Sequence, residues 1–178
     1  MYKFLTIAAA AVLSFGLVSC AQNDGKPTSD PGTGVNAPSQ DGTSAPATTA
    51  ESTNSVFGQA FTFKNGLSVG VSGPQPFSPS ASASTRNAQG EFVSFDVTIV
   101  NGSADNYEPA MFSTSLQSGN TEADQVFDTA SGIGGAPSTV LLPSRESQFT
   151  IAFEVSDPAD LVLQVSPGFE YRKAIFTN

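Results

Sequence analysis

The stretch EFVSFDVTIVN, residues 91–101, decides the fold, because apolar and polar side chains alternate along it. Val93, Phe95, Val97 and Ile99 alternate with Ser94, Asp96 and Thr98. A period of two is the pattern of a β-strand with one buried face and one solvent face. FTIAFEV at 149–155 and LSVGV at 67–71 alternate in the same way. We therefore expect all three stretches to be strands of an all-β domain.

Shorter apolar runs surround these three stretches and are separated by turn signals. The additional strands are expected at 60–64, 111–117, 125–128, 139–142, 161–165 and 173–177. Asn65-Gly66 lies between two apolar runs, which is a strong hairpin signal. Roughly seven to nine short strands in a domain of about 120 residues predict an immunoglobulin-like antiparallel β-sandwich over residues 57–178. We place Phe95 and Phe153 at the centre of its core.

The segment before this domain has a different composition. Residues 21–56 contain no aromatic residue, and apart from alanine only Val35 and Val56 are apolar. Such a segment cannot bury enough surface to offset the entropy of ordering it. We therefore expect residues 20–56 to form a disordered linker rich in Ser, Thr, Pro and Gly. Its root-mean-square reach would be roughly 30–35 Å.

The N-terminus has the organisation of a signal peptide over residues 1–19. Lys3 gives a positive start, and an apolar run follows from Leu5 to Val18. This run has the length of a signal-peptide core and is short for a membrane span. The four residues that end it, LVSC at 17–20, resemble the lipobox of bacterial lipoproteins. The alternative is an ordinary secretory peptide with an incidental cysteine.

The lipobox resemblance implies a modified cysteine. Cleavage would fall between Ser19 and Cys20, and Cys20 would carry a thioether-linked diacylglycerol with fatty acyl chains such as palmitate. Lipidation also explains why the chain has a single cysteine, because exported thiols are normally paired. Two acyl chains hold a protein stably where one chain does not. We expect a lipoprotein on the extracytoplasmic face of the cell membrane, anchored through lipid on Cys20.

Composition excludes several classes of function. The chain has 7 Lys and Arg against 16 Asp and Glu, which argues against binding to nucleic acid. It has no histidine, so a Ser-His-Asp triad is impossible. We predict that it is not an enzyme, and we assign no catalytic residue, metal ligand or cofactor. Loop carboxylates remain as candidates for glycoside hydrolysis or calcium binding: Asp105, Glu108, Glu122, Asp124 and Asp128, the last three being the calcium candidates.

Three longer stretches together resemble a known family of domains. They are FTFKNGLSVGVSGPQPFSP, EFVSFDVTIVNGSADNYEPAMFSTSLQSG and LLPSRESQFTIAFEVSDPADLVLQVSP. Their order and spacing resemble the lipoprotein-associated domain-of-unknown-function family 4352. The resemblance implies an immunoglobulin-like fold, a Gram-positive cell envelope and an interaction or accessory role, with no catalytic residues to transfer.

These observations predict a binding module held at the cell surface. Long loops on a rigid sandwich are common sites of recognition, and the candidates are residues 77–91, 103–110 and 129–138. The expected partner is a protein of the envelope or of another surface. The alternative is an accessory protein that binds a small ligand or calcium for an envelope transporter.

Overall fold

The computed structural model describes residues 24–28, 54–87 and 90–178. The predicted signal peptide, Cys20 and most of the predicted linker lie outside these residues. Within the described ranges, no helix is long and apolar enough to cross a membrane.

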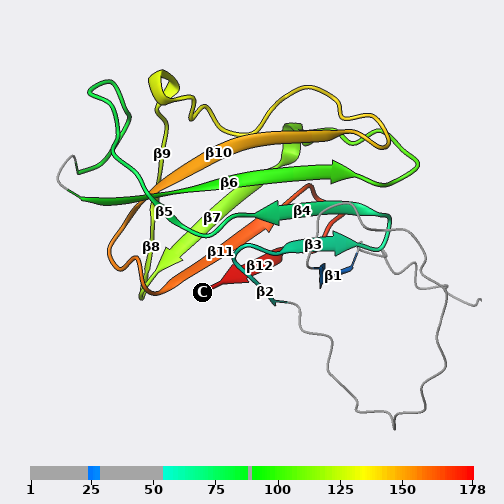
Figure 1. The fold of residues 1–178 in the computed structure, drawn as a ribbon, viewed down its shortest axis with the longest axis horizontal. Coiled ribbons are helices and arrows are strands. Elements are labelled where there is room, and N and C mark those ends of the chain that lie inside the picture. The colour runs from blue at the N-terminus through cyan, green and yellow to red at the C-terminus, as the bar shows by residue number, and fades with distance from the viewer. Residues whose placement is uncertain (1–23, 29–53, 88–89) are drawn as a thin grey trace, which may run out of the picture.

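Within the described residues the first sheet contains seven strands, and Figure 1 shows its long central pair, β6 and β10. Its strands are β1 (Gly25–Thr28), β3 (Ala60–Phe63), β4 (Leu67–Val71), β5 (Gln75–Pro76), β6 (Glu91–Asn101), β9 (Asp124–Val126) and β10 (Glu146–Val155). They run in the order β1-β3-β4-β6-β10-β9, and β5 also pairs with β6. The β6–β10 pairing is antiparallel along its whole length, with Phe95 opposite Ile151.

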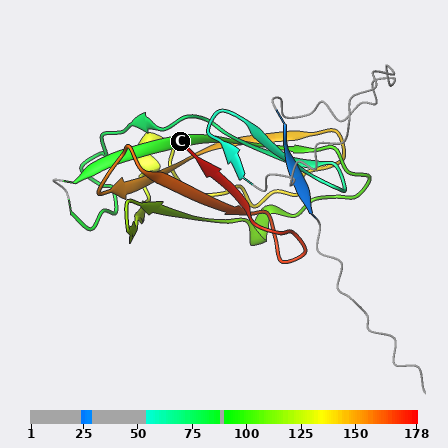
Figure 2. The same cartoon turned by 90° about the horizontal axis from the view of Figure 1, so that it is seen from below.

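The second sheet packs under the first, and Figure 2 shows the two layers from the side. It contains β2 (Asn54–Val56), β7 (Ser113–Ser118), β8 (Thr121–Glu122), β11 (Leu161–Ser166) and β12 (Ala174–Thr177). The order is β2-β12-β11-β7-β8. All its pairings are antiparallel except β2 with β12, which is parallel. Two single 3₁₀ turns, at Pro109–Met111 and Thr129–Ser131, are the helical elements of the described chain.

The path of the chain between the sheets is that of an immunoglobulin constant-type domain. That topology has strands A, B, E and D in one sheet and C, F and G in the other. Here β4, β6, β10 and β9 take the places of A, B, E and D, while β7, β11 and β12 take those of C, F and G. The predicted immunoglobulin-like sandwich is therefore confirmed, with β1, β2, β3, β5 and β8 added to its basic seven strands.

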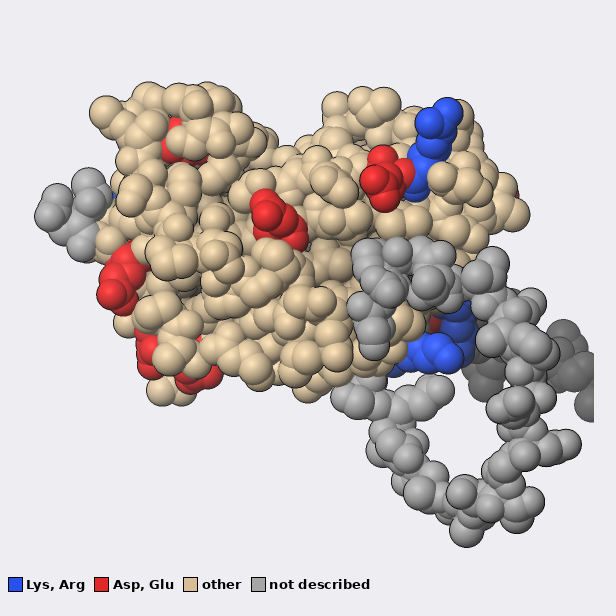
Figure 3. Space-filling view, viewed as in Figure 1, with Lys and Arg blue, Asp and Glu red and all other residues tan. Residues whose placement is uncertain are grey.

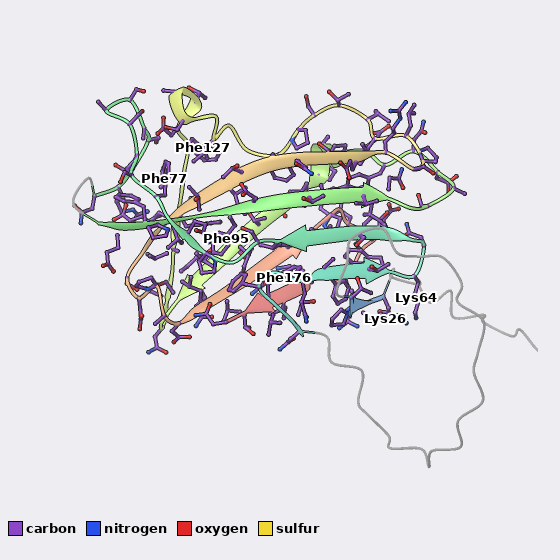
Figure 4. The ribbon with its side chains drawn as sticks, viewed as in Figure 1. Lys26, Lys64, Phe77, Phe95, Phe127 and Phe176 are labelled. Atoms are coloured by element: carbon purple, nitrogen blue, oxygen red, sulfur yellow. The ribbon has the colours of Figure 1, made fainter. Side chains whose placement is uncertain are left out.

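The core between the sheets includes most of the side chains that the alternation assigned to it. Phe95 and Phe153 are fully or almost fully buried, and their rings meet edge to face at 6.4 Å. Phe57 stacks on Phe95 at 5.1 Å. Phe176, from the last strand, is also fully buried, and Figure 4 shows it near Phe95. Phenylalanine and β-branched packing therefore holds the sandwich.

The predicted hairpin at Asn65-Gly66 joins β3 to β4. Gly66 has a φ of 97°, which a side chain would strain. A Cβ on Gly66 would also lie 2.8 Å from the carbonyl carbon of Gly102, at the end of β6. Glycine at 66 thus permits both the turn and the close approach of a neighbouring loop.

The structure differs from the sequence predictions at several places, including the short unpredicted strands β5 and β8. Gly25–Thr28 and Asn54–Val56 fall within the predicted linker but form strands, because each finds an open sheet edge, on β3 and β12. Residues 139–142 were expected to form a strand. They contribute only an isolated bridge between Leu141 and Tyr107.

Candidate functional site

The B–C and F–G loops lie together at one end of the sandwich. In this topology they are residues 102–112, between β6 and β7, and residues 167–173, between β11 and β12. In antibody variable domains the corresponding end carries the antigen-binding loops. Here the two loops enclose a pocket of about 410 Å³, lined by Asn106, Tyr107, Glu108, Met111, Pro167, Gly168, Phe169, Glu170 and Tyr171. We call this pocket and its rim the end site.

Two buried tyrosines make the floor of the end site rigid. The Tyr107 hydroxyl donates to the carbonyl oxygen of Pro167 at 2.9 Å and so joins the two loops. Asn65 Nδ2 donates to the Tyr171 hydroxyl at 2.9 Å, which ties the β3–β4 hairpin to the same floor. The rings of Tyr107 and Tyr171 meet edge to face at 6.3 Å. Burial raises the pKa of both phenols, most strongly that of Tyr107.

The rim of the end site carries exposed apolar side chains. Phe169 is 86 % exposed and Met111 is 49 % exposed. Two exposed carboxylates, Glu108 and Glu170, flank them. A side chain as large as phenylalanine in water gains from a partner that buries it. The rim therefore combines an apolar contact with negative charge.

A second loop cluster covers the outer face of the first sheet near the other end. Residues 77–87 and 127–135 meet there through the bridge between Ser84 and Phe127. Together they bury Phe92, Val126, Ile133 and Ala152 in a small core of its own. Figure 4 shows Phe77 and Phe127 in this cluster, above the sheet. Phe127 is 46 % exposed.

A buried carboxylate fixes this cluster. Asp128 accepts hydrogen bonds from the backbone N–H of Ser80 at 2.7 Å, from the Ser80 hydroxyl at 2.7 Å and from the Ser131 hydroxyl at 2.8 Å. These bonds, the Ser80 N–H first, lower the pKa of Asp128 to about 2. Its oxygens are thus occupied by the protein, which gives Asp128 a structural role.

The structure does not assemble the acidic residues into a metal or catalytic centre. Asp124 pairs with Arg86 at 2.8 Å, while Glu122 lies exposed in β8. Asp105 and Glu108 belong to the opposite end of the sandwich, in the B–C loop. Among residues 24–28, 54–87 and 90–178, no three acidic or thiol side chains come close enough to hold a metal ion. Glu108 is the candidate carboxylate that lines the end site.

The three loops predicted as a contact surface divide between the two ends. Residues 77–87 and 129–138 contribute to the cluster around Asp128, whereas 103–110 belongs to the end site. The sequence analysis missed the other half of the end site, PGFEY at 167–171. Pro167-Gly168 was identified only as a turn signal. Phe169 and Tyr171, the aromatic residues that follow this turn, are the sequence signal that could have identified it as part of a binding site.

Comparison with known proteins does not place the chain in a family, since no family model, no curated protein and no solved structure matches it. The resemblance to the family of unknown function therefore stays a prediction.

Proposed function

We propose that this protein is a lipid-anchored lipoprotein of the cell envelope, which binds a partner protein through the end site. The lipobox-like sequence that ends in Cys20 supports the anchor. The exposure of Phe169 beside a rigid pocket supports the binding role and is the observation that carries it. A non-enzymatic role agrees with the lack of histidine in the sequence and with the separation of the acidic candidates.

The chemistry of the end site indicates the kind of partner surface that fits it. Phe169 and Met111 would insert next to apolar side chains of the partner. Glu108 and Glu170 would attract Lys or Arg at the edge of that apolar contact. Aromatic residues and methionine are enriched in protein interfaces, and a few such anchors supply most of the binding energy. We therefore expect a basic, partly apolar protein surface as the partner.

The anchor is tested by replacing Cys20 with serine in the producing cell. The Cys20→Ser chain should leave the membrane fraction and should incorporate no radiolabelled palmitate. A substitution at Ser14, inside the apolar run, serves as the control and should leave both properties unchanged. Membrane retention of the Cys20→Ser chain with normal processing would overturn the anchor.

The end site is tested by photo-crosslinking on intact cells. A photoreactive phenylalanine analogue at 169 should give a discrete adduct, because Phe169 points into solvent at the rim. The same analogue at Gln117, exposed on β7, is the matched control and should give none.

Charge reversal makes the crosslinking test specific. Glu108→Lys together with Glu170→Lys should abolish the adduct at 169 if the partner surface is basic. Glu122→Lys with Asp160→Lys makes the same change in charge outside the end site and should leave the adduct intact. An adduct that survives reversal at 108 and 170 contradicts a basic partner, and no adduct at 169 contradicts the binding role.

A further inference from the structure

The segment from Asp24 to Thr28, which begins four residues after Cys20, is attached to the domain. β1 pairs with β3 in antiparallel register, with Lys26 opposite Thr62. The hydroxyls of Thr28 and Thr62 lie 3.0 Å apart. The backbone N–H of Lys64 donates to the carbonyl oxygen of Asp24 at 2.6 Å, and Lys64 Nζ lies 2.8 Å from Asp24 Oδ2. β1 is therefore held by main-chain pairing, hydroxyl contacts and an ion pair.

The pairing of β1 requires glycine at position 25. A Cβ on Gly25 would lie 2.8 Å from the Cα of Phe63 and would also collide with the Phe61 ring and with the carbonyl oxygen of Thr62. Backbone atoms cannot move aside as a flexible side chain can. A larger residue at 25 would therefore release β1, which gives a direct way to test what β1 does.

Docking of β1 shortens the tether between Cys20 and the domain. The chain from Cys20 to Asp24 spans four residues and reaches at most roughly 14 Å when fully extended. Without β1, the free tether would extend to Asn54 and its root-mean-square reach would be roughly 30 Å. With β1 in place, the β1–β3 edge must stay close to the point where Cys20 is anchored.

Basic side chains gather at this same edge. Lys26, Lys64 and Arg172 line a pocket of about 380 Å³ together with Asp24. These three are part of a total of seven Lys and Arg in a chain of net charge −9. Figure 3 shows the basic patch at the lower right, over the β1 region, while acidic side chains lie scattered elsewhere on that face. Figure 4 shows Lys26 and Lys64 beside β1.

The basic side chains keep access to solvent, and among the described residues that line the pocket Asp24 is the one acidic side chain. The Lys64 side chain is 70 % exposed, and Arg172 Nη1 lies 3.8 Å from Asp24 Oδ1. Three positive charges surround one carboxylate, so the pocket keeps an excess of positive charge. An anionic membrane surface attracts each Lys or Arg near it. The rest of this acidic domain would be repelled by the same surface, which orients the domain.

We propose that Lys26, Lys64 and Arg172 bind the phosphate groups of anionic lipids in the membrane that holds Cys20, and that β1 keeps them there. The proposal rests on the lipid anchor proposed above. Arg172 follows Tyr171 in the floor of the end site. A domain seated in this way holds the end site near the bilayer, within reach of a partner that is itself at the membrane.

The test measures which part of the domain lies near lipid headgroups. The chain from Cys20 onward is coupled through its single thiol to a maleimide lipid in nanodiscs, so the result does not depend on lipidation in the cell. A headgroup-nitroxide lipid then broadens the NMR signals of nearby amides. In discs of phosphatidylcholine with phosphatidylglycerol, broadening should centre on Gly25, Lys26 and Lys64. It should spare Gly119 and Ser156, at the opposite end of the sandwich.

Two variants separate the charge from the tether. Lys26→Gln with Arg172→Gln leaves the 2.8 Å ion pair between Lys64 and Asp24 in place and should reduce the broadening to the level seen in pure phosphatidylcholine. Arg145→Gln with Lys173→Gln removes the same charge outside the pocket and should preserve the broadening. Gly25→Val should release β1 and weaken the broadening at Lys64, although all basic side chains remain.

Each outcome decides the proposal. Broadening that is equal at both ends, that is independent of phosphatidylglycerol, or that survives Lys26→Gln with Arg172→Gln overturns the proposal. If the wild-type chain is not lipidated at Cys20 in cells but the broadening in nanodiscs is as expected, the anchor is overturned and the lipid-binding surface is supported.

Discussion

The two cores of this domain are built from different interactions although β6 and β10 contribute to both. The large core between the sheets consists of aliphatic and aromatic side chains and contains Phe95 and Phe153. The small core on the outer face contains Phe92 and Ala152, under loops that Asp128 holds in place. Side-chain packing thus stabilises the first, whereas hydrogen bonds to one carboxylate close the second. We expect the first to govern global unfolding and the second to govern local opening.

Removing an aromatic ring from the large core should have the largest effect. Phe153→Ala should lower the free energy of unfolding by about 3–5 kcal/mol, through lost burial and the cavity left behind. The midpoint of urea denaturation, followed by circular dichroism, measures this loss. A loss below about 1 kcal/mol would show that Phe153 is not at the centre of the stability of the sandwich.

Removing an apolar side chain from the small core should have an intermediate effect. Ile133→Ala should cost about 2 kcal/mol, at the low end for such truncations because the covering loop can relax into the space. Hydrogen exchange should accelerate in residues 127–135 more than in β6. Val140→Ala, at an exposed position, is the control and should change neither measurement. Equal acceleration in β6 would mean that the two cores open together.

Neutralising the carboxylate should have the smallest effect, and that effect depends on pH. The folded pKa of Asp128 is lowered to about 2 from its usual value of 3.8. Its contribution to stability is therefore present above about pH 4 and is lost as the pH falls toward 2. Asp128→Asn should remove this part of the acid dependence and accelerate exchange in the loops at neutral pH.

The exposed Asp160 provides the control for the acid titration. Thermal melts of the wild type, Asp128→Asn and Asp160→Asn between pH 2 and pH 5 would compare the three directly. An acid dependence in Asp128→Asn as steep as in the wild type would mean that another group closes the small core.

The contrast between the cores also explains what the sequence could predict. Alternation along 93–99 and 149–155 identified the sheets and placed Phe95 and Phe153 correctly, because period two reports which face is buried. The same rule put Ala152 on the solvent face, and it is fully buried. Its cover comes from loops far away in sequence, which no local pattern describes. Gly25–Thr28 was missed for a similar reason, because its pairing depends on an open edge of β3.

The end site was only half predictable. Residues 103–110 were selected as a long polar loop, whereas 167–171 is short and was identified only as a turn. The two meet because β6 and β11 end on the same side of the sandwich, and this follows from the order of strands in the sheets. The basic pocket required the same kind of knowledge, since Lys26, Lys64 and Arg172 are distant in sequence.

The position of β1 has a practical consequence for anyone who shortens this protein. A truncated chain that starts at residue 54 looks harmless from the composition. It would lack β1, however, and would leave one edge of β3, AFTF at residues 60–63, with unpaired main-chain groups. Bare edges of this kind recruit strands from other molecules. Lys26 and Pro27 discourage such recruitment in the intact chain, so truncated forms should self-associate and aggregate more readily than the full chain.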